Sequence, residues 1–154
     1  MKNLYVLFLL LLMPLVSCSR APQMEVSDQK HFRNIMDENH KIHKFLFEND
    51  TRLPGIKSLQ DVLDQVQSKD PVFQEKLDRI STMLASIDSR DRMKFIKSYS
   101  AISLVYGEII KTYNIKQYTR FYCSMEDNNW ISSGFKIENP YSPEMRDCGE
   151  IIQE

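Results

Sequence analysis

Residues 91–114 of the chain read DRMKFIKSYSAISLVYGEIIKTYN, and apolar side chains recur in this stretch every three or four residues. Such spacing places the apolar side chains along one side of a helix. The main stripe consists of Phe95, Tyr99, Ile102, Tyr106, Ile109 and Tyr113. Further apolar residues widen this stripe, and they are Met93, Ile96, Leu104 and Val105. A helix with so wide an apolar surface is typical of the centre of a bundle, so the stretch predicts a mainly helical fold.

Three further helices are predicted before the central one. Residues 29–48 carry apolar side chains mostly on one helical face, and Asp28 is placed to cap the first turn. A second helix is predicted to begin at Ser58. Asp70 followed by Pro71 is typical of the start of a third helix, with Asp70 as the N-cap and Pro71 at the first helical position. The chain is therefore expected to form a small bundle of about four helices.

The chain begins with a basic residue and an apolar run. Lys2 precedes residues 4–16, LYVLFLLLLMPLV, which are almost entirely apolar. This run is shorter than the roughly 20 residues that a transmembrane helix needs, and it has the length of the apolar core of an export signal. The start of the chain therefore predicts export from the cytoplasm.

The residues Leu15, Val16, Ser17 and Cys18 close this apolar run. They resemble the lipobox of bacterial lipoproteins, in which an aliphatic residue, a small or aliphatic residue and a small residue precede an acylated cysteine. The resemblance implies that residues 1–17 are a signal peptide and that Cys18 becomes the lipidated N-terminus. The lipid would anchor the mature chain to a membrane.

The mature chain is predicted to have two parts. Residues 19–28 are polar, contain Pro22 and lack periodicity, so residues 18–28 would be the lipidated N-terminus and a tether, and residues 29–154 the helical domain. Ser19 follows the cysteine where an aspartate would favour the inner membrane, so the resemblance implies an outer-membrane anchor facing the periplasm. Two alternatives remain open. Ordinary signal peptidase could cut after Ser19 and release a secreted soluble protein, or the apolar segment could stay as an uncleaved anchor.

If Cys18 carries lipid, Cys123 and Cys148 are the remaining cysteines. Two thiols in an exported domain are expected to pair. The bridge would close a loop of about 25 residues and contribute roughly 3 kcal/mol in the chain-entropy model. Redox catalysis would favour closely spaced cysteines such as C-x-x-C, so a structural disulfide is the preferred interpretation.

The sequence beyond Ile115 leaves two structures open. Residues 118–125 and 130–137 fit a short β-hairpin around the polar run EDNN. A frayed helical continuation followed by a looped tail fits the same residues. The disulfide would staple this C-terminal segment in either case.

The tyrosines Tyr99, Tyr106 and Tyr113 recur at a strict seven-residue spacing on the central helix. Their simplest interpretation is the bundle core, with the hydroxyls reaching its rim. The alternative is a groove or partner interface, where tyrosine is enriched. The aromatic residues continue toward the C-terminal segment. The candidate interaction surface therefore comprises Tyr99, Tyr106, Tyr113, Tyr118, Tyr122 and Trp130.

No sequence pattern marks a catalytic or cofactor-binding site. The 21 acidic and 20 basic residues are interleaved, without the basic surplus typical of nucleic-acid binding. The sequence lacks a G-x-S-x-G elbow and a glycine-rich phosphate loop. His40 and His43 share a helix face near Asp37, but catalytic zinc draws ligands from several elements, so a solvated face is the preferred interpretation. We expect no enzymatic activity, no metal and no cofactor.

Two functions fit these expectations. The first is a lipid-anchored envelope protein whose helical domain binds another envelope protein, in a secretion, conjugation or exclusion role. The second is a periplasmic module that binds a small molecule or lipid in a pocket lined by Tyr99 and Tyr106. The expected partners are the membrane and another envelope protein, and nucleic acid is not among them.

Overall fold

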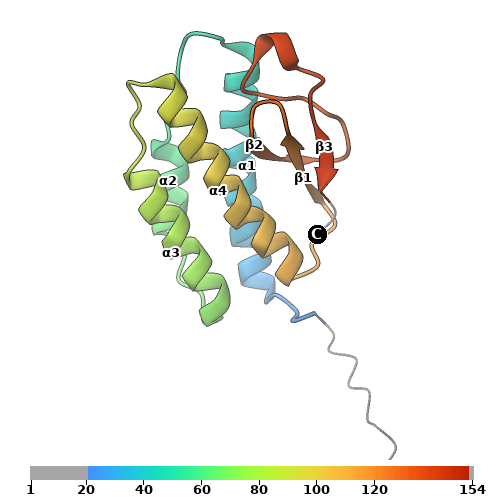
Figure 1. Cartoon of the computed structure of the whole chain (residues 1–154). Coiled ribbons are helices and arrows are strands. Elements are labelled where there is room, and N and C mark those ends of the chain that lie inside the picture. Colours follow the sequence, from blue (N-terminus) through green and yellow to red (C-terminus); the bar gives the residue numbers. More distant parts are fainter. Residues whose placement is uncertain (1–20, 153–154) are drawn as a thin grey trace, which may run out of the picture.

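The computed structural model describes residues 21–152. The predicted signal peptide, residues 1–17, and the predicted lipidation site Cys18 lie outside these described residues. The described chain forms four α-helices, one short 3-10 helix and a small three-stranded sheet that lies against one side of the helices (Figure 1). Within this part of the chain, no helix has the length and apolar character that crossing a bilayer requires.

The order of the elements confirms the predicted mainly helical fold. The helices are α1 (Val26–Glu48), α2 (Lys57–Asp64), α3 (Pro71–Ala85), α4 (Arg92–Thr112) and the 3-10 helix η1 (Pro143–Met145). The strands are β1 (Tyr118–Cys123), β2 (Asn128–Ser133) and β3 (Glu150–Ile152).

Helix α1 begins at Val26, three residues before its predicted start at Gln29. Asp28 does not cap the helix but is buried, and its carboxylate accepts a hydrogen bond of 2.6 Å from Ser68 Oγ. Met24 is also buried, and its carbonyl accepts a hydrogen bond of 2.9 Å from Gln29 Nε2. Met24 and Asp28 of the predicted tether are therefore packed onto the domain, and residues 26–28 belong to α1.

The start of α3 follows the predicted pattern. Asp70 is the N-cap, and its side chain accepts hydrogen bonds from the backbone N–H groups of Val72 (2.9 Å) and Phe73 (3.3 Å). Pro71 is the first helical residue. Both predictions for this helix start are confirmed.

Helix α4 lies between α3 and the sheet, with α3 on one side and β2 on the other (Figure 1). This position explains why its apolar surface is so wide. The chain leaves the helix at Asn114, which has a left-handed φ of 51°. The N–H of Ile115 then bonds to the carbonyl of Ile110 at 2.9 Å, which closes the helix and directs the chain into β1.

The C-terminal segment contains the β-hairpin, so the helical alternative is wrong. Strands β1 and β2 pair antiparallel, with Phe121 opposite Trp130. Strand β3 pairs antiparallel with the other edge of β1, with Ile151 opposite Phe121. The sequence did not indicate β3, because three residues are too few to show an alternating pattern.

The predicted disulfide between Cys123 and Cys148 is confirmed, and their Cα atoms lie 5.4 Å apart. It joins the end of β1 to the residue two positions before β3. The bridge therefore holds the third strand beside the hairpin.

Side chains from other parts of the chain form hydrogen bonds with backbone groups along the outer edge of β2. The N–H of Asn129 donates to Ser100 Oγ at 2.7 Å, and its carbonyl accepts from the Tyr141 hydroxyl at 2.9 Å. The carbonyl of Ile131 accepts from Asn39 Nδ2 at 3.3 Å. An exposed strand edge is a template for pairing with another chain, and these bonds block it at residues 129 and 131.

Gly149 lies against the ring of Trp130. A Cβ at this position would lie 2.7 Å from Cη2 of Trp130 and 3.0 Å from Cγ2 of Ile137. The indole cannot easily give way, because it is buried and stacked on Phe121 with ring centroids 5.5 Å apart. The close approach of the backbone to this ring therefore requires glycine.

Gly149→Ala is expected to lower the free energy of unfolding by about 1–3 kcal/mol, since the added methyl overpacks the site. Urea unfolding followed by circular dichroism measures the change. Gly55→Ala is the matched control, because a Cβ there meets nothing within 4 Å. Equal stability of the two variants would contradict the packing argument.

Candidate interaction surface

Four of the six aromatic residues predicted as an interaction surface lie in the core. Tyr99, Tyr106 and Trp130 are at most 2% exposed, and Tyr113 is 8% exposed. These four side chains pack inside the domain, and for the three tyrosines this is the simplest interpretation of their seven-residue spacing. They are not available to a partner in this structure.

The hydroxyls of two of these tyrosines bond to distant residues. Tyr99 donates to Asn39 Oδ1 on α1, and Tyr113 donates to Asp70 Oδ2, each at 2.6 Å. Burial raises the pKa of Tyr113, and its hydrogen bond to Asp70 raises it further. The same bond lowers the pKa of the Asp70 carboxyl. These tyrosines therefore connect α4 to α1 and to the start of α3.

The face that was expected to line a ligand pocket is filled by aromatic rings. Tyr99 stacks on Phe95 with ring centroids 5.8 Å apart, and Tyr106 meets the edge of Phe32 at 6.5 Å. Tyr106 is fully buried and its hydroxyl has no hydrogen-bond partner among the described residues. Burial raises the pKa of Tyr106. Because its ring is enclosed and packs on Phe32, this tyrosine is a packing residue.

The remaining two aromatic residues, Tyr118 and Tyr122, alternate on β1 with buried residues. Thr119, Phe121 and Cys123 are buried, whereas Tyr118, Arg120 and Tyr122 are half-buried. Tyr122 donates a hydrogen bond of 3.1 Å to Asp127 Oδ1, and Arg120 donates one of 3.1 Å to Asn129 Oδ1. We call Tyr118, Arg120 and Tyr122 the β1 row. Tyrosine and arginine are the residue types that partner interfaces favour.

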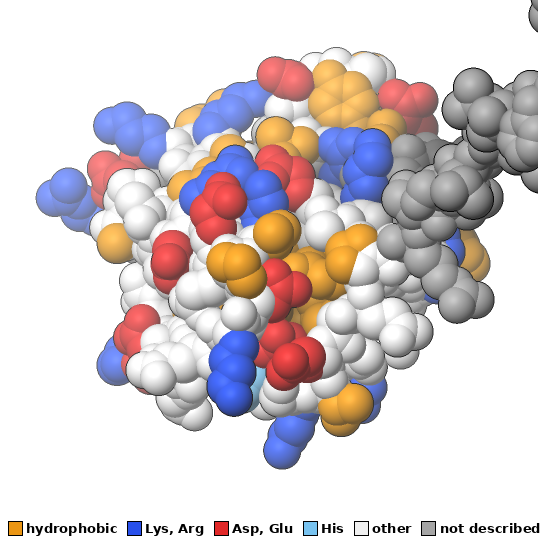
Figure 2. All heavy atoms as spheres, turned by 90° about the horizontal axis from the view of Figure 1, so that it is seen from below, with side chains coloured by type: hydrophobic (Ala, Val, Ile, Leu, Met, Phe, Trp, Pro, Cys, Tyr) orange, Lys and Arg blue, Asp and Glu red, His pale blue; other side chains and the backbone are white. Residues whose placement is uncertain are grey.

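A groove of about 810 Å³ lies at the end of the domain where residue 21 is found. One wall comprises residues 21–26 and the first turns of α1, and the other comprises the end of α4 and the connection to β1. Tyr118 lines the groove as well as belonging to the β1 row. Figure 2 shows this end of the domain, where apolar side chains lie among acidic and basic ones.

The side chains that line the groove are partly apolar and partly charged. Phe32 meets the edge of Tyr118 with ring centroids 5.8 Å apart. Arg33 and Lys116 are on opposite walls, and Glu25 also lines the groove. Burial raises the pKa of Tyr118; the negative charge of Asp37 adds to this, and Arg33 opposes it. The groove therefore suits a partner that is partly apolar and partly charged.

The interpretation of the histidine pair as a solvated face is wrong for His43. Its side chain is 5% exposed, and its Nε2 lies 2.9 Å from the carbonyl oxygen of Glu138. The rings of His40 and His43 stack with centroids 6.4 Å apart. Within residues 21–152, no three His, Cys, Asp or Glu side chains form a group that could hold a metal ion.

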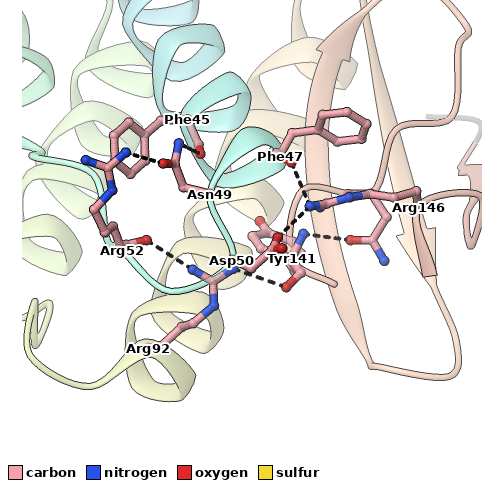
Figure 3. A network of polar contacts seen from close by, with 9 residues as sticks. Phe45, Phe47, Asn49, Asp50, Arg52, Arg92, Tyr141 and Arg146 are labelled. Carbon is pink, nitrogen blue, oxygen red and sulfur yellow. Dashed lines mark hydrogen bonds and ion pairs between the residues drawn. The ribbon is translucent and has the colours of Figure 1, made fainter. Parts of the chain in front are cut away.

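Two arginines hold the loops together at the end opposite the groove (Figure 3). Arg146 donates to the carbonyl of Phe47 at 2.6 Å and to Asp50 Oδ1 at 3.0 Å, and its guanidinium lies over the Phe47 ring. Arg92 donates to the carbonyl of Tyr141 at 3.4 Å. These contacts join the end of α1, the start of α4 and the C-terminal segment. The sequence could not indicate them, because each one links residues far apart in the chain.

Comparison with known proteins adds no relative: no family model, no curated protein and no solved structure matches the chain. The residues themselves therefore carry any conclusion about function.

Acid is expected to destabilise the fold through His43. Burial lowers the pKa of His43 below its ordinary value of 6.5. The hydrogen bond to the Glu138 carbonyl raises this pKa, but by less than burial lowers it. At pH values between the lowered pKa and 6.5, His43 binds a proton in the unfolded chain but not in the folded chain. The free energy of unfolding therefore falls as the pH decreases through this window.

Urea unfolding measured between pH 7.5 and pH 5 tests this expectation. His43→Gln keeps an N–H donor for the Glu138 carbonyl but cannot gain the proton, so it should lose part of the pH dependence. His31→Gln, at a partly exposed position on the same helix, should keep the wild-type dependence. The same slope in wild type and His43→Gln would rule out this role.

Proposed function

We propose that the chain is a lipoprotein of the cell envelope, anchored through Cys18, whose domain binds another envelope protein. Support comes from the lipobox-like residues 15–18 at the end of the apolar run. The Cys123–Cys148 disulfide supports an oxidising compartment. It also leaves Cys18 as the one cysteine of the chain outside the bridge.

One observation carries the proposal furthest: among the described residues the first buried side chain is that of Met24, close to the lipobox cysteine in the sequence. Met24 follows Cys18 by six positions, and six extended residues span at most about 22 Å. A lipid on Cys18 would therefore hold one end of the domain close to the bilayer. The proposal assigns that end to the membrane and leaves the sides and the opposite end to a protein partner.

The β1 row is the surface that we assign to the protein partner. Tyr118, Arg120 and Tyr122 lie on one face of a strand whose other side chains are buried. A strand in a disulfide-stapled sheet holds these side chains in place, so little conformational entropy is lost on binding. The paired strand β3 extends this face, because Ile152 lies opposite Arg120 and Glu150 opposite Tyr122.

Labelled palmitate is expected to be incorporated into the wild-type chain and not into Cys18→Ala, because the thiol of Cys18 is the proposed acylation site. Gel autoradiography of cells fed the label measures incorporation. The double variant Cys123→Ser and Cys148→Ser serves as the control and should keep the label. Unchanged labelling of Cys18→Ala would overturn the anchor.

A photo-crosslinking amino acid at Tyr122 is expected to capture one discrete protein in living cells, because this side chain lies in the β1 row. The same amino acid at Met93, which is 66% exposed at the start of α4, provides the control. Immunoblots of the irradiated cells detect the adducts, and mass spectrometry identifies them. The same abundant proteins captured from both positions would contradict a specific partner on this strand.

A further inference from the structure

The end of the domain that carries the groove also carries cations without ionic partners. Many cations elsewhere are paired, as in Lys76 with Glu108, Lys57 with Asp61 and Arg146 with Asp50. At the groove end, by contrast, five cations form no ion pair with any described residue. They are Lys30, Arg33, Lys69, Lys111 and Lys116.

These cations come from four separate parts of the chain. They lie on the first turns of α1, before the start of α3, in the last turn of α4 and in the connection to β1. Figure 1 places the start of α1, the start of α3 and the end of α4 at one end of the bundle. The fold therefore brings unpaired positive charge from distant segments to one end of the domain.

The carboxylates at this end neutralise only part of that charge. Glu25, Asp64 and Glu75 are exposed there, three carboxylates against five cations. Asp28 and Asp70 are instead held in hydrogen bonds to Ser68 and Tyr113, each 2.6 Å long. The unpaired cations thus remain available to an anionic surface.

Exposed apolar side chains accompany the cations. Val26, in the first turn of α1, is 82% exposed, and Val72, in the first turn of α3, is 45% exposed. Both helices start at the groove end (Figure 1). Cations surrounding exposed apolar side chains are the combination that a lipid surface binds, through its anionic headgroups and the start of its acyl chains.

We propose that the groove end of the domain lies directly on anionic phospholipid headgroups, with Arg33 and Lys116 against phosphate groups and Val26 at the boundary with the acyl chains. The inference rests on the proposed function, because the short link from Cys18 brings this end to the bilayer. The lipid contact would fix the orientation of the domain, so that Tyr118 lies at the membrane edge of the β1 row while Arg120 and Tyr122 stand at the side of the domain.

Hydrogen exchange on the full lipidated chain in nanodiscs tests the proposal. One set of nanodiscs contains phosphatidylglycerol mixed with phosphatidylcholine, and the other contains phosphatidylcholine alone. The amides of residues 113–118 are expected to exchange more slowly in the anionic nanodiscs, and salt should remove the difference. Equal exchange in both lipids would overturn the proposal.

Matched variants identify the side chains responsible. Lys116→Glu should abolish the slower exchange, whereas Lys44→Glu, an exposed cation in the second half of α1, should leave it unchanged. Val26→Glu should weaken the effect more than Met93→Glu at the opposite end. An effect of Lys44→Glu equal to that of Lys116→Glu would refute the assignment of the contact to the groove end.

The outcomes separate this inference from the function on which it rests. Palmitate labelling that depends on Cys18, without any slower exchange in anionic nanodiscs, would overturn the lipid contact and leave the anchor in place. Slower exchange that appears only after envelope proteins are added would assign the groove to a protein and would also overturn the inference. Loss of the Cys18 dependence of labelling would remove the anchor itself.

Discussion

The fold depends on the burial of helix α4 from more than one side. A single neighbouring helix covers only one stripe of its surface, and α3 provides that cover. The other side needs a second layer, and strand β2 supplies it. The C-terminal segment therefore completes the core, and the disulfide to Cys148 keeps its last strand in place. Because the hydrophobic effect drives this burial, the sheet and the helices stabilise each other.

Sequence patterns predicted the elements whose signals are local. The apolar spacing of residues 91–114 gave the central helix, and Asp70 with Pro71 gave the start of α3. The hairpin remained one of two alternatives, because a short apolar run fits a strand or a helix equally well. Asp28 misled the prediction of the first helix, since its partner is Ser68, forty positions away in the chain. Contacts at such separations leave no periodic pattern in the sequence.

The candidate interaction surface could be predicted only in part. Periodicity shows that Tyr99 and Tyr106 share a helix face, but not whether that face meets another element or solvent. The answer depends on Asn39 and Phe32, which belong to a different helix. The two half-buried tyrosines owe their exposure to strand alternation in β1. The groove escaped prediction altogether, because its walls are brought together only by the folded chain.

The bonds that close the edge of β2 have a consequence for self-association. Within the described chain, Asn39, Ser100 and Tyr141 occupy backbone groups of this edge at residues 129 and 131. Strand β3 forms the other edge of the sheet. A strand from a second molecule would have to displace these three side chains before it could pair with β2, so the hydrogen bonds that hold the sheet on the helices also oppose its extension on this side.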